Sequence, residues 1–313
     1  MTADDLICPR CSASVRMGGG HYACASATCG AAYPVIRGVP VLIDEGKSVF
    51  RVSDLTGSAD APGFRGSLLF RIGKKIVPSI SHNLEAAKNY SELARLLRQA
   101  GGKATILVIG GGVAGQGIDE LLAEPSFELV ETDVYLGPRT NFVCDAHDLP
   151  FRSGSFNAVI AQAVLEHVVD PGRVAAEIHR VLKPQGLVYA ETPFMQQVHM
   201  GRHDFTRYTY LGHRRLFRGF TEIRSGMVSG PGETLAWALK YFFLSFVSPR
   251  PLRIGVAVLS HCLFFWLKYF DHWIRRNDAS FDSASAFYFL GRRSGTPLDD
   301  RELLRLYRGG GVF

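Results

Sequence analysis

Short apolar segments alternate with helical ones from about residue 82 to residue 192, and this alternation limits the chain to few folds. Residues 104–109, ATILVI, form a continuous apolar run, as expected of a strand that is covered on both faces. The other predicted elements are strands at 127–132, 141–144, 156–162, 186–192 and 286–292, and helices at 82–99, at 172–182 and before Ala123. Such alternation requires right-handed crossovers, so the sequence predicts a doubly wound, mainly parallel α/β sheet.

A glycine-rich loop follows the first of these strands. Residues 110–115, GGGVAG, match the pattern G-x-G-x-x-G and are expected to open a helix. Asp133 lies 18 residues after Gly115, at the end of the second strand, where a carboxylate can accept hydrogen bonds from both hydroxyls of a ribose. The ribose can belong to NAD or to S-adenosylmethionine, and a strand–helix turn without a ligand is the third interpretation.

Four segments after the loop distinguish between NAD, S-adenosylmethionine and a turn without a ligand. They are DAHDLPF at 145–151, SFNAV at 155–159, LEHVVDP at 165–171 and EIHRVLKPQG at 177–186. In combination they resemble the motifs of class I S-adenosylmethionine-dependent methyltransferases of the type-11 group, over roughly residues 100–225. The resemblance implies a Rossmann-like methyltransferase sheet of seven strands.

The same resemblance implies which residues hold the cofactor. In such enzymes the glycines line its methionine end, an acid holds the ribose, a second acid and its neighbour face the adenine, and two residues lie behind the sulfonium. In this chain Gly110, Gly112 and Gly115 correspond to the glycines at the methionine end, and Asp133 corresponds to the acid at the ribose. Asp145 and Ala146 correspond to the pair that faces the adenine. Gln162 and Ala163 correspond to the two residues behind the sulfonium.

Three positions depart from the family pattern. Val108 stands where the family usually has an acid that helps to hold the methionine part of the cofactor, Asn157 replaces an aspartate, and Gln185 replaces a glycine. A domain that binds S-adenosylmethionine without turnover, as a scaffold, is therefore the alternative to an enzyme.

Candidate catalytic groups follow the fourth and fifth strands, where the cleft is expected. Methyl transfer depends mainly on alignment of donor and acceptor, and a base is needed only if the acceptor must lose a proton. His203 and Asp204, in the polar segment 199–217, form one candidate pair of base and orienting group. His167, in the L-E-H motif, is the other candidate base. The alternatives are an Asp204–Arg207 structural ion pair and a His167 that only shapes the pocket.

Four cysteines cluster near the N-terminus. Cys8 and Cys11 are separated by two residues, and Cys24 and Cys29 by four. This spacing predicts a structural zinc site, because four thiolates complete a tetrahedron and leave no open position. A metal-free β module and a reversible disulfide are the alternatives. The segment ICPRC…C…CGAAYPVIRGVPVLI resembles the small zinc-binding activator domain that pairs with tRNA, rRNA and release-factor methyltransferases.

Residues 233–247 and 254–274 are rich in Phe, Trp and Leu and are flanked by Lys and Arg. The uninterrupted apolar run at 254–267 has 14 residues, fewer than the roughly 18 that suggest a membrane span. The two segments are expected to form either a hairpin at a membrane interface or a buried cap over the acceptor pocket.

The predicted organisation is a zinc-binding module at 1–44, a linker at 45–81, a methyltransferase core at 82–232 and 280–296, an apolar helical segment at 233–279 and a tail at 297–313. The N-terminus has no apolar signal segment, so the expected location is the cytoplasm, with peripheral contact at the inner face of the membrane. A lipid, a glycan, a quinone-like ring and a small metabolite all remain open as methyl acceptors. The formal charge of +6 is too small and too dispersed to support a nucleic acid partner by itself, so such a partner is not expected but stays open.

Overall fold

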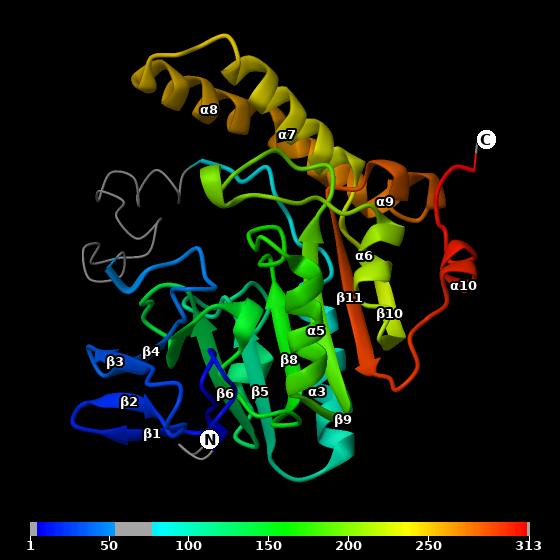
Figure 1. The fold of residues 1–313 in the computed structure, drawn as a ribbon. Coiled ribbons are helices and arrows are strands. Elements are labelled where there is room, and N and C mark those ends of the chain that lie inside the picture. The colour runs from blue at the N-terminus through cyan, green and yellow to red at the C-terminus, as the bar shows by residue number, and fades with distance from the viewer. Residues whose placement is uncertain (1–4, 54–76, 312–313) are drawn as a thin grey trace.

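The computed structural model describes residues 5–53 and 77–311, which form an α/β structure around one mixed sheet (Figure 1). The sheet has 11 strands in the order β1-β2-β3-β4-β7-β6-β5-β8-β9-β11-β10. Their bounds are β1 Val15–Gly18, β2 His21–Cys24, β3 Ala32–Ile36, β4 Val39–Leu42, β5 Ala104–Ile109, β6 Phe127–Asp133, β7 Phe142–Cys144, β8 Phe156–Gln162, β9 Leu182–Pro193, β10 Phe220–Ser229 and β11 Ala286–Arg293.

Helices cover both faces of the sheet (Figure 1). The α-helices are α3 Ala86–Ala100, α4 Asp119–Ala123, α5 Pro171–Val181, α6 Tyr210–Leu216, α7 Pro231–Leu244, α8 Arg250–Phe264, α9 Asp271–Ile274 and α10 Asp300–Leu304. Helix α5 begins at a Pro preceded by the side chain of Asp170, which accepts the N–H of Arg173. Its apolar stripe and that of α3 bury opposite faces of the strands in two separate clusters.

The predicted parallel sheet is present, but its strand number was wrong. Strands β5 and β8 occupy the predicted ranges, and β5–β9 pair in parallel in the order β7-β6-β5-β8-β9. The sheet has 11 strands instead of seven because β4 pairs in parallel with β7, joining Val41 to Val143, and so adds β1–β4 to the edge. Strand β10, which the sequence did not predict, is antiparallel to β11.

The glycine loop also differs from the prediction. Helix α4 begins at Asp119 and has five residues, so the loop does not open directly into a helix. Instead, the loop turns back over β6: Gly110 has a φ of +71°, and the N–H of Gly112 donates to the Asp133 carboxylate at 3.1 Å. The loop therefore contacts the end of β6 through its backbone.

Helices α7 and α8 lie side by side beyond one end of the sheet, and residues 265–270 connect α8 to α9 (Figure 1). The buried Asp271 carboxylate accepts the N–H groups of Gly230, Gly232 and Glu233 at 2.7–3.1 Å, which fixes α9 to the N-terminus of α7. By length and composition alone, residues Arg250–Ile274 are long and apolar enough to cross a membrane. Their attachment through Asp271 favours a position along the protein surface.

Candidate active site

A cavity opens at the carboxyl ends of the parallel strands. The loop after β5 contributes Gly110, the end of β6 contributes Asp133, the segment after β7 contributes Asp145 and Ala146, and the segment after β8 contributes Ala163. These five residues are among those that the resemblance assigned to the cofactor. Their convergence follows from the parallel sheet, which brings successive strand ends to one edge.

Asp133 is positioned by backbone donors at the edge of this cavity. Its two carboxylate oxygens accept the N–H groups of Gly112 at 3.1 Å and of Tyr135 at 3.3 Å. Burial raises the pKa of Asp133 above its ordinary value, although these N–H groups act in the opposite direction. Further lone pairs of the carboxylate are available to ribose hydroxyls.

The close approach around Gly112 requires glycine at two positions. A Cβ on Gly112 would lie 2.7 Å from the Asp133 carboxylate, and a Cβ on Gly137 would lie 2.7 Å from the Cα of Gly112. Sequence reasoning identified Gly112 and missed Gly137, because the need for Gly137 arises from a tertiary contact with the loop.

Asp145 is held by both of its oxygens. Ser48 donates to one oxygen at 2.5 Å, and the backbone N–H of His147 donates to the other at 3.0 Å. Burial acts to raise the pKa of Asp145, but hydrogen bonds from His147 and Ser48 outweigh it, so the pKa lies below its ordinary value. Asp145 is therefore a carboxylate at neutral pH.

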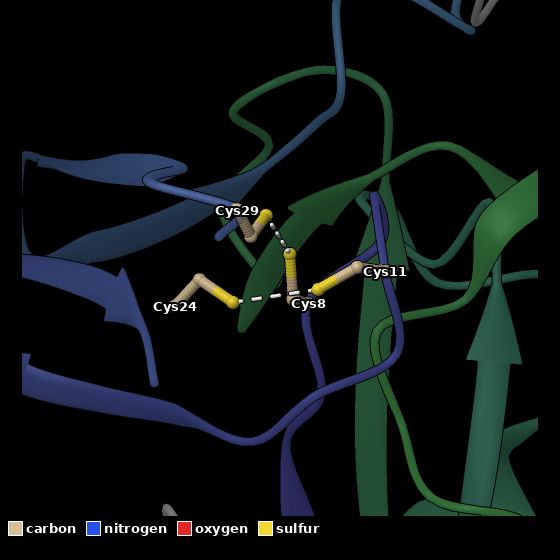
Figure 2. Close-up of side chains that lie close together, drawn as sticks. All are labelled: Cys8, Cys11, Cys24 and Cys29. Carbon is tan, nitrogen blue, oxygen red and sulfur yellow. Dashed lines mark hydrogen bonds between the residues drawn. The ribbon is translucent and has the colours of Figure 1, made fainter. Parts of the chain in front are cut away.

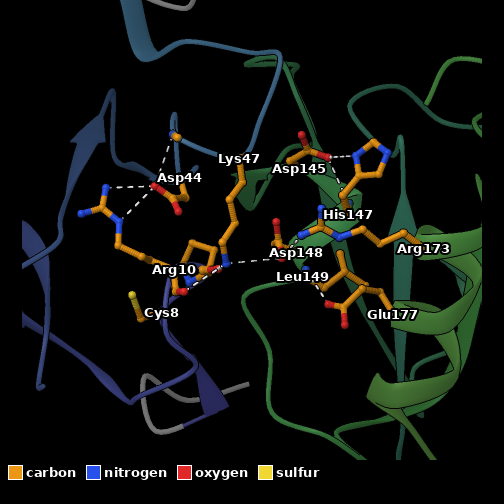
Figure 3. Close-up of polar contacts among 12 residues, drawn as sticks. Cys8, Arg10, Asp44, Lys47, Asp145, His147, Asp148, Leu149, Arg173 and Glu177 are labelled. Atoms are coloured by element: carbon orange, nitrogen blue, oxygen red, sulfur yellow. Dashed lines mark hydrogen bonds and ion pairs between the residues drawn. The ribbon is translucent and has the colours of Figure 1, made fainter. Parts of the chain in front are cut away.

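Residues 44–50 connect the cysteine-containing segment to the cavity (Figure 3). Arg10 donates to Asp44 at 2.9 Å, and the Lys47 ammonium donates to the carbonyl oxygens of Pro9 and Arg10 at 3.1 and 3.0 Å. Val49 and Phe50 then line the cavity. The sequence predicted a linker at 45–81 and did not indicate that these two residues line the cavity. The part of this linker from 54 to 76 lies outside the described residues.

The other three expected cofactor residues, Gly112, Gly115 and Gln162, are not among those that line the cavity. The Gln162 side chain accepts the Tyr90 hydroxyl at 3.2 Å and donates to Glu191 at 3.0 Å. A Cβ on Gly115 would overlap the Gln162 amide oxygen. Gly115 and Gln162 therefore lie next to each other beside this polar network, and their role toward a cofactor stays a prediction.

The predicted catalytic pair is divided between different partners. Asp204 forms a two-pronged ion pair with Arg207, with one contact of 2.7 Å, and accepts the N–H of His199 at 2.9 Å. Burial opposes ionisation of Asp204, but the hydrogen bond from Arg207 dominates and lowers its pKa to about 2. His203 lines the cavity and packs edge-on against Phe50. The contacts of Asp204 match the structural ion pair named above, while the catalytic assignment of both residues stays a prediction.

Glu166 and His167 follow β8 and face this polar segment. His167 lines the cavity, and its Nδ1 donates to the carbonyl oxygen of His203 at 2.8 Å. Burial lowers the pKa of His167, so the imidazole is neutral at pH 7. The Glu166 side chain is 1% exposed, and burial raises its pKa to about 8.

The four N-terminal cysteines come together in two pairs (Figure 2). The sulfur atoms of Cys8 and Cys29 are 3.8 Å apart, and those of Cys11 and Cys24 are 3.5 Å apart. A disulfide would place the two sulfurs at about 2.05 Å. In a tetrahedral site with metal–sulfur bonds of about 2.3 Å, neighbouring sulfurs are about 3.8 Å apart. The cluster therefore has the dimensions of a four-thiolate metal site.

Comparison with known proteins gives a match over part of the chain. Residues 114–190 match the profile described as a methyltransferase domain. The ubiquinone/menaquinone biosynthesis C-methyltransferase UbiE of Desulfotalea psychrophila is 50% identical over 44 residues, which are 14% of this chain and 18% of that protein.

Two solved structures are similar at low sequence identity. Phosphoethanolamine N-methyltransferase 2 of Haemonchus contortus, in complex with phosphomonomethylethanolamine and S-adenosylhomocysteine, is 16% identical with a TM-score of 0.44, over 74% of this chain and 59% of that one. A chain from the complex of the Haloferax volcanii Trm112 methyltransferase activator with its partner is 16% identical with a TM-score of 0.37, over 69% of this chain and 98% of that one. The match to the methyltransferase profile begins inside the glycine loop, ends in β9 and is confined to residues 114–190.

Proposed function

We propose that the chain is an S-adenosylmethionine-dependent methyltransferase. The observation that carries the proposal is the convergence of Asp133, Asp145 and Gly110 on one cavity within and beside the matched domain. Asp133 would hold the ribose and Asp145 the adenine. The bound cofactor supplies a methyl group on a sulfonium, whose sulfur is already a good leaving group. The protein then has to align the acceptor and, where the acceptor carries a proton, accept or release it.

The acceptor side of the cavity is formed by the segment that contains Met200 and His203, opposite Phe50. His203 and His167 are the candidates for a base, and Asp204 positions the segment through Arg207, which also donates to the carbonyl oxygens of Gln196 and Gln197. We assign binding and alignment to these residues, with proton transfer at a His203 or His167 nitrogen.

Titration calorimetry tests the proposal. S-adenosylhomocysteine is expected to bind the full chain with micromolar affinity, NADH is not, and Asp133→Asn is expected to weaken binding at least tenfold. Absence of any heat from S-adenosylhomocysteine at millimolar concentration would refute the assignment.

A protein that binds the cofactor without turnover is the second candidate. It is favoured by the buried Val108 on β5, in place of the usual acid. Profiling of metabolites and lipids in cells with and without the gene separates the two. An enzyme predicts a pair of compounds that differ by one CH2 group, about 14 daltons.

We propose zinc for the cysteine cluster, as a structural ion. Four thiolates occupy all positions of a tetrahedral ion, and the phenol of the buried Tyr33 lies 3.0 Å from the sulfur of Cys8, as a supporting contact. The ion would fix the turn that carries Pro9 and Arg10, to which Lys47 is bonded.

We propose that helices α7–α9 lie on an anionic membrane surface, at the inner face of the membrane, and that the acceptor is lipid-associated. The described residues expose 25 large apolar side chains, and 14 of them lie between Leu235 and Ile274. Residues 234–270 contain no Asp or Glu and four basic residues. An apolar face with basic ends is typical of helices that lie in the interface of anionic bilayers.

A further inference from the structure

Glu166, His167 and His199 converge at the wall between the cofactor cavity and a second hollow. His167 lines the cavity, whereas Glu166 and His199 line the second hollow together with Glu191 and Glu233. One ligand atom from each of the three residues lies within 4.8 Å of the others. None of these three is proposed above to hold the cofactor. A metal-ligand role for His167 would replace the base role considered for it above, because Nδ1 already donates to a carbonyl oxygen.

The Glu166 carboxyl lacks the partners that a buried acid needs. Its side chain is 1% exposed, and its Oε2 has no hydrogen-bond partner among the described residues. Its Oε1 lies 3.7 Å from His167 Nε2, which is too far for a hydrogen bond. A buried polar atom without a hydrogen-bond partner destabilises the folded state. A cation at this point would give Oε2 the electrostatic partner that it lacks.

The two histidines are arranged as metal ligands usually are. A metal-binding histidine commonly donates its other ring N–H to a carbonyl or carboxylate, which fixes the ring and its tautomer. The Nδ1 of His167 donates to the carbonyl oxygen of His203 at 2.8 Å, so its Nε2 carries a free lone pair facing Glu166. The Nδ1 of His199 lies 3.3 Å from the carbonyl oxygen of Gln197 and 3.5 Å from the Asp204 carboxylate, which leaves its Nε2 for an ion.

We propose that Glu166, His167 and His199 bind a divalent transition-metal ion that holds a hydroxyl group of the methyl acceptor. Two imidazoles and one carboxylate suit Mn²⁺, Fe²⁺ or Zn²⁺, and three protein ligands leave positions open. Bonds of about 2.1 Å require the ligand atoms to be about 3–3.5 Å apart. The ligand atoms, which now lie within 4.8 Å of one another, must therefore come closer together when an ion binds. Rotation of the exposed His199 side chain would bring its ring nitrogen toward Glu166 and His167.

The acceptor part of this inference rests on the proposed methyltransferase function. A metal-bound hydroxyl loses its proton to water more readily, because the ion stabilises the oxyanion. That oxygen forms the new bond to the methyl carbon while the methyl–sulfur bond breaks, and the electron pair of that bond stays on the sulfur. The site therefore favours an O-methyltransferase for phenols or vicinal diols.

Electron paramagnetic resonance of Mn²⁺ tests the metal site in full-length protein that holds a single equivalent of Zn²⁺, which fills the cysteine cluster and leaves no zinc for the second site. Mn²⁺ is suitable because carboxylate and imidazole ligands accept it, while thiolates retain zinc. One Mn²⁺ is expected to bind per chain, and Glu166→Gln and His199→Gln are each expected to weaken binding at least tenfold. The control His21→Gln changes an exposed histidine of the β1–β2 hairpin and should bind Mn²⁺ as the wild type does.

Two results would overturn the metal site: no binding at millimolar Mn²⁺, or equal binding by wild type and Glu166→Gln. Pyrocatechol tests the acceptor position, because a bidentate phenol should displace water from the ion and reduce the enhancement of water proton relaxation. An unchanged enhancement would overturn that part. Binding of S-adenosylhomocysteine, measured on the same samples, reports on the proposed function separately.

Discussion

At the scale of single residues, the contact between Gly137 and Gly112 allows a sharp test of the cofactor loop. A methyl group in Gly137→Ala would overlap the backbone of Gly112, which cannot move as a flexible side chain could. The loop would shift away from Asp133, to which the Gly112 N–H donates. We expect the dissociation constant of S-adenosylhomocysteine to rise at least tenfold in titration calorimetry.

The matched control is Gly255→Ala, because a Cβ on Gly255 in α8 meets no atom within 4 Å. It should bind S-adenosylhomocysteine as the wild type does. Equal affinity of Gly137→Ala and the wild type would show that the loop does not contact the cofactor.

His213 predicts a loss of stability in mild acid. The ring is 2% exposed, and burial, assisted by Arg214, lowers its pKa to about 3. The unfolded chain binds a proton at this residue below about pH 6.5, whereas the folded chain does not. The stabilisation is thus complete above pH 6.5 and is lost as pH falls, by about 2 kcal/mol between pH 6.5 and 5.

His213→Leu should remove this part of the pH dependence. The free energy of unfolding, measured with urea at pH 7 and pH 5, is expected to fall less in the variant than in the wild type. An identical fall in both proteins would mean that His213 is accessible to protons in the folded state.

Sequence reasoning succeeded for residues whose role depends on the end of a strand. Asp133 is the last residue of β6 and Asp145 directly follows β7, and a parallel sheet brings such strand ends together. It failed for Val49, Phe50 and Gly137, whose roles depend on contacts between distant segments. It also could not show that Gln162 bonds to Tyr90 and Glu191 instead of lining the cavity.

At the scale of elements, residues 44–50 couple the cysteine cluster to the cofactor cavity. Lys47 bonds to two carbonyl oxygens of the turn between Cys8 and Cys11, and the next residues are Ser48, which bonds to Asp145, and Val49, which lines the cavity. Lys47→Met removes the ammonium and keeps an apolar stem. We expect a several-fold loss of affinity for S-adenosylhomocysteine with an unchanged zinc content.

Zinc is measured by elemental analysis and affinity by calorimetry. Lys103→Met is the control, because Lys103 is exposed just before β5 and has the same charge change. Equal weakening in the two variants would assign the effect to net charge instead of to the contact with the turn.

The accuracy of the predicted elements followed their apolar pattern. Strands β5, ATILVI, and β8, FNAVIAQ, each contain a run of at least four apolar residues and were placed correctly. Strand β10, FTEIRSGMVS, mixes polar and apolar residues because only Phe220 and its last four residues are buried, so the sequence contains no continuous apolar run there. Helix α4 does not follow the glycine loop directly, because the backbone at Gly112 turns toward Asp133 and the helix begins only at Asp119.

At the scale of the whole molecule, the sheet is larger than the family resemblance implied. The sequence treated the first 44 residues as a separate module, since their cysteines and turns form a local pattern. The parallel pairing of β4 with β7 depends on two short strands about 100 residues apart, and no local pattern reports such a contact.

Helices α7 and α8 connect their exposed apolar surface to the segment beside the cavity. The Tyr241 hydroxyl on α7 donates to the carbonyl oxygen of Val198 at 2.9 Å, next to His199 and Met200. The inner side of α8 is held to the protein, where His261 bonds to the carbonyl oxygen of Pro78 at 3.0 Å. The outer side can therefore meet a membrane while the segment beside the cavity stays in contact with α7.

Vesicle flotation tests this arrangement. The full chain is expected to float with vesicles of phosphatidylcholine and phosphatidylglycerol, and less with phosphatidylcholine alone, because Arg250, Arg253 and Arg276 are exposed beside the apolar face. The double variant Phe246→Ser/Trp273→Ser removes two side chains that are 74% and 68% exposed, and it should remain in the soluble fraction. Leu304→Ser, on α10 and 67% exposed, is the matched control and should float. Flotation of the double variant to the wild-type extent, or no flotation of the wild type, would show that this surface meets something other than a bilayer.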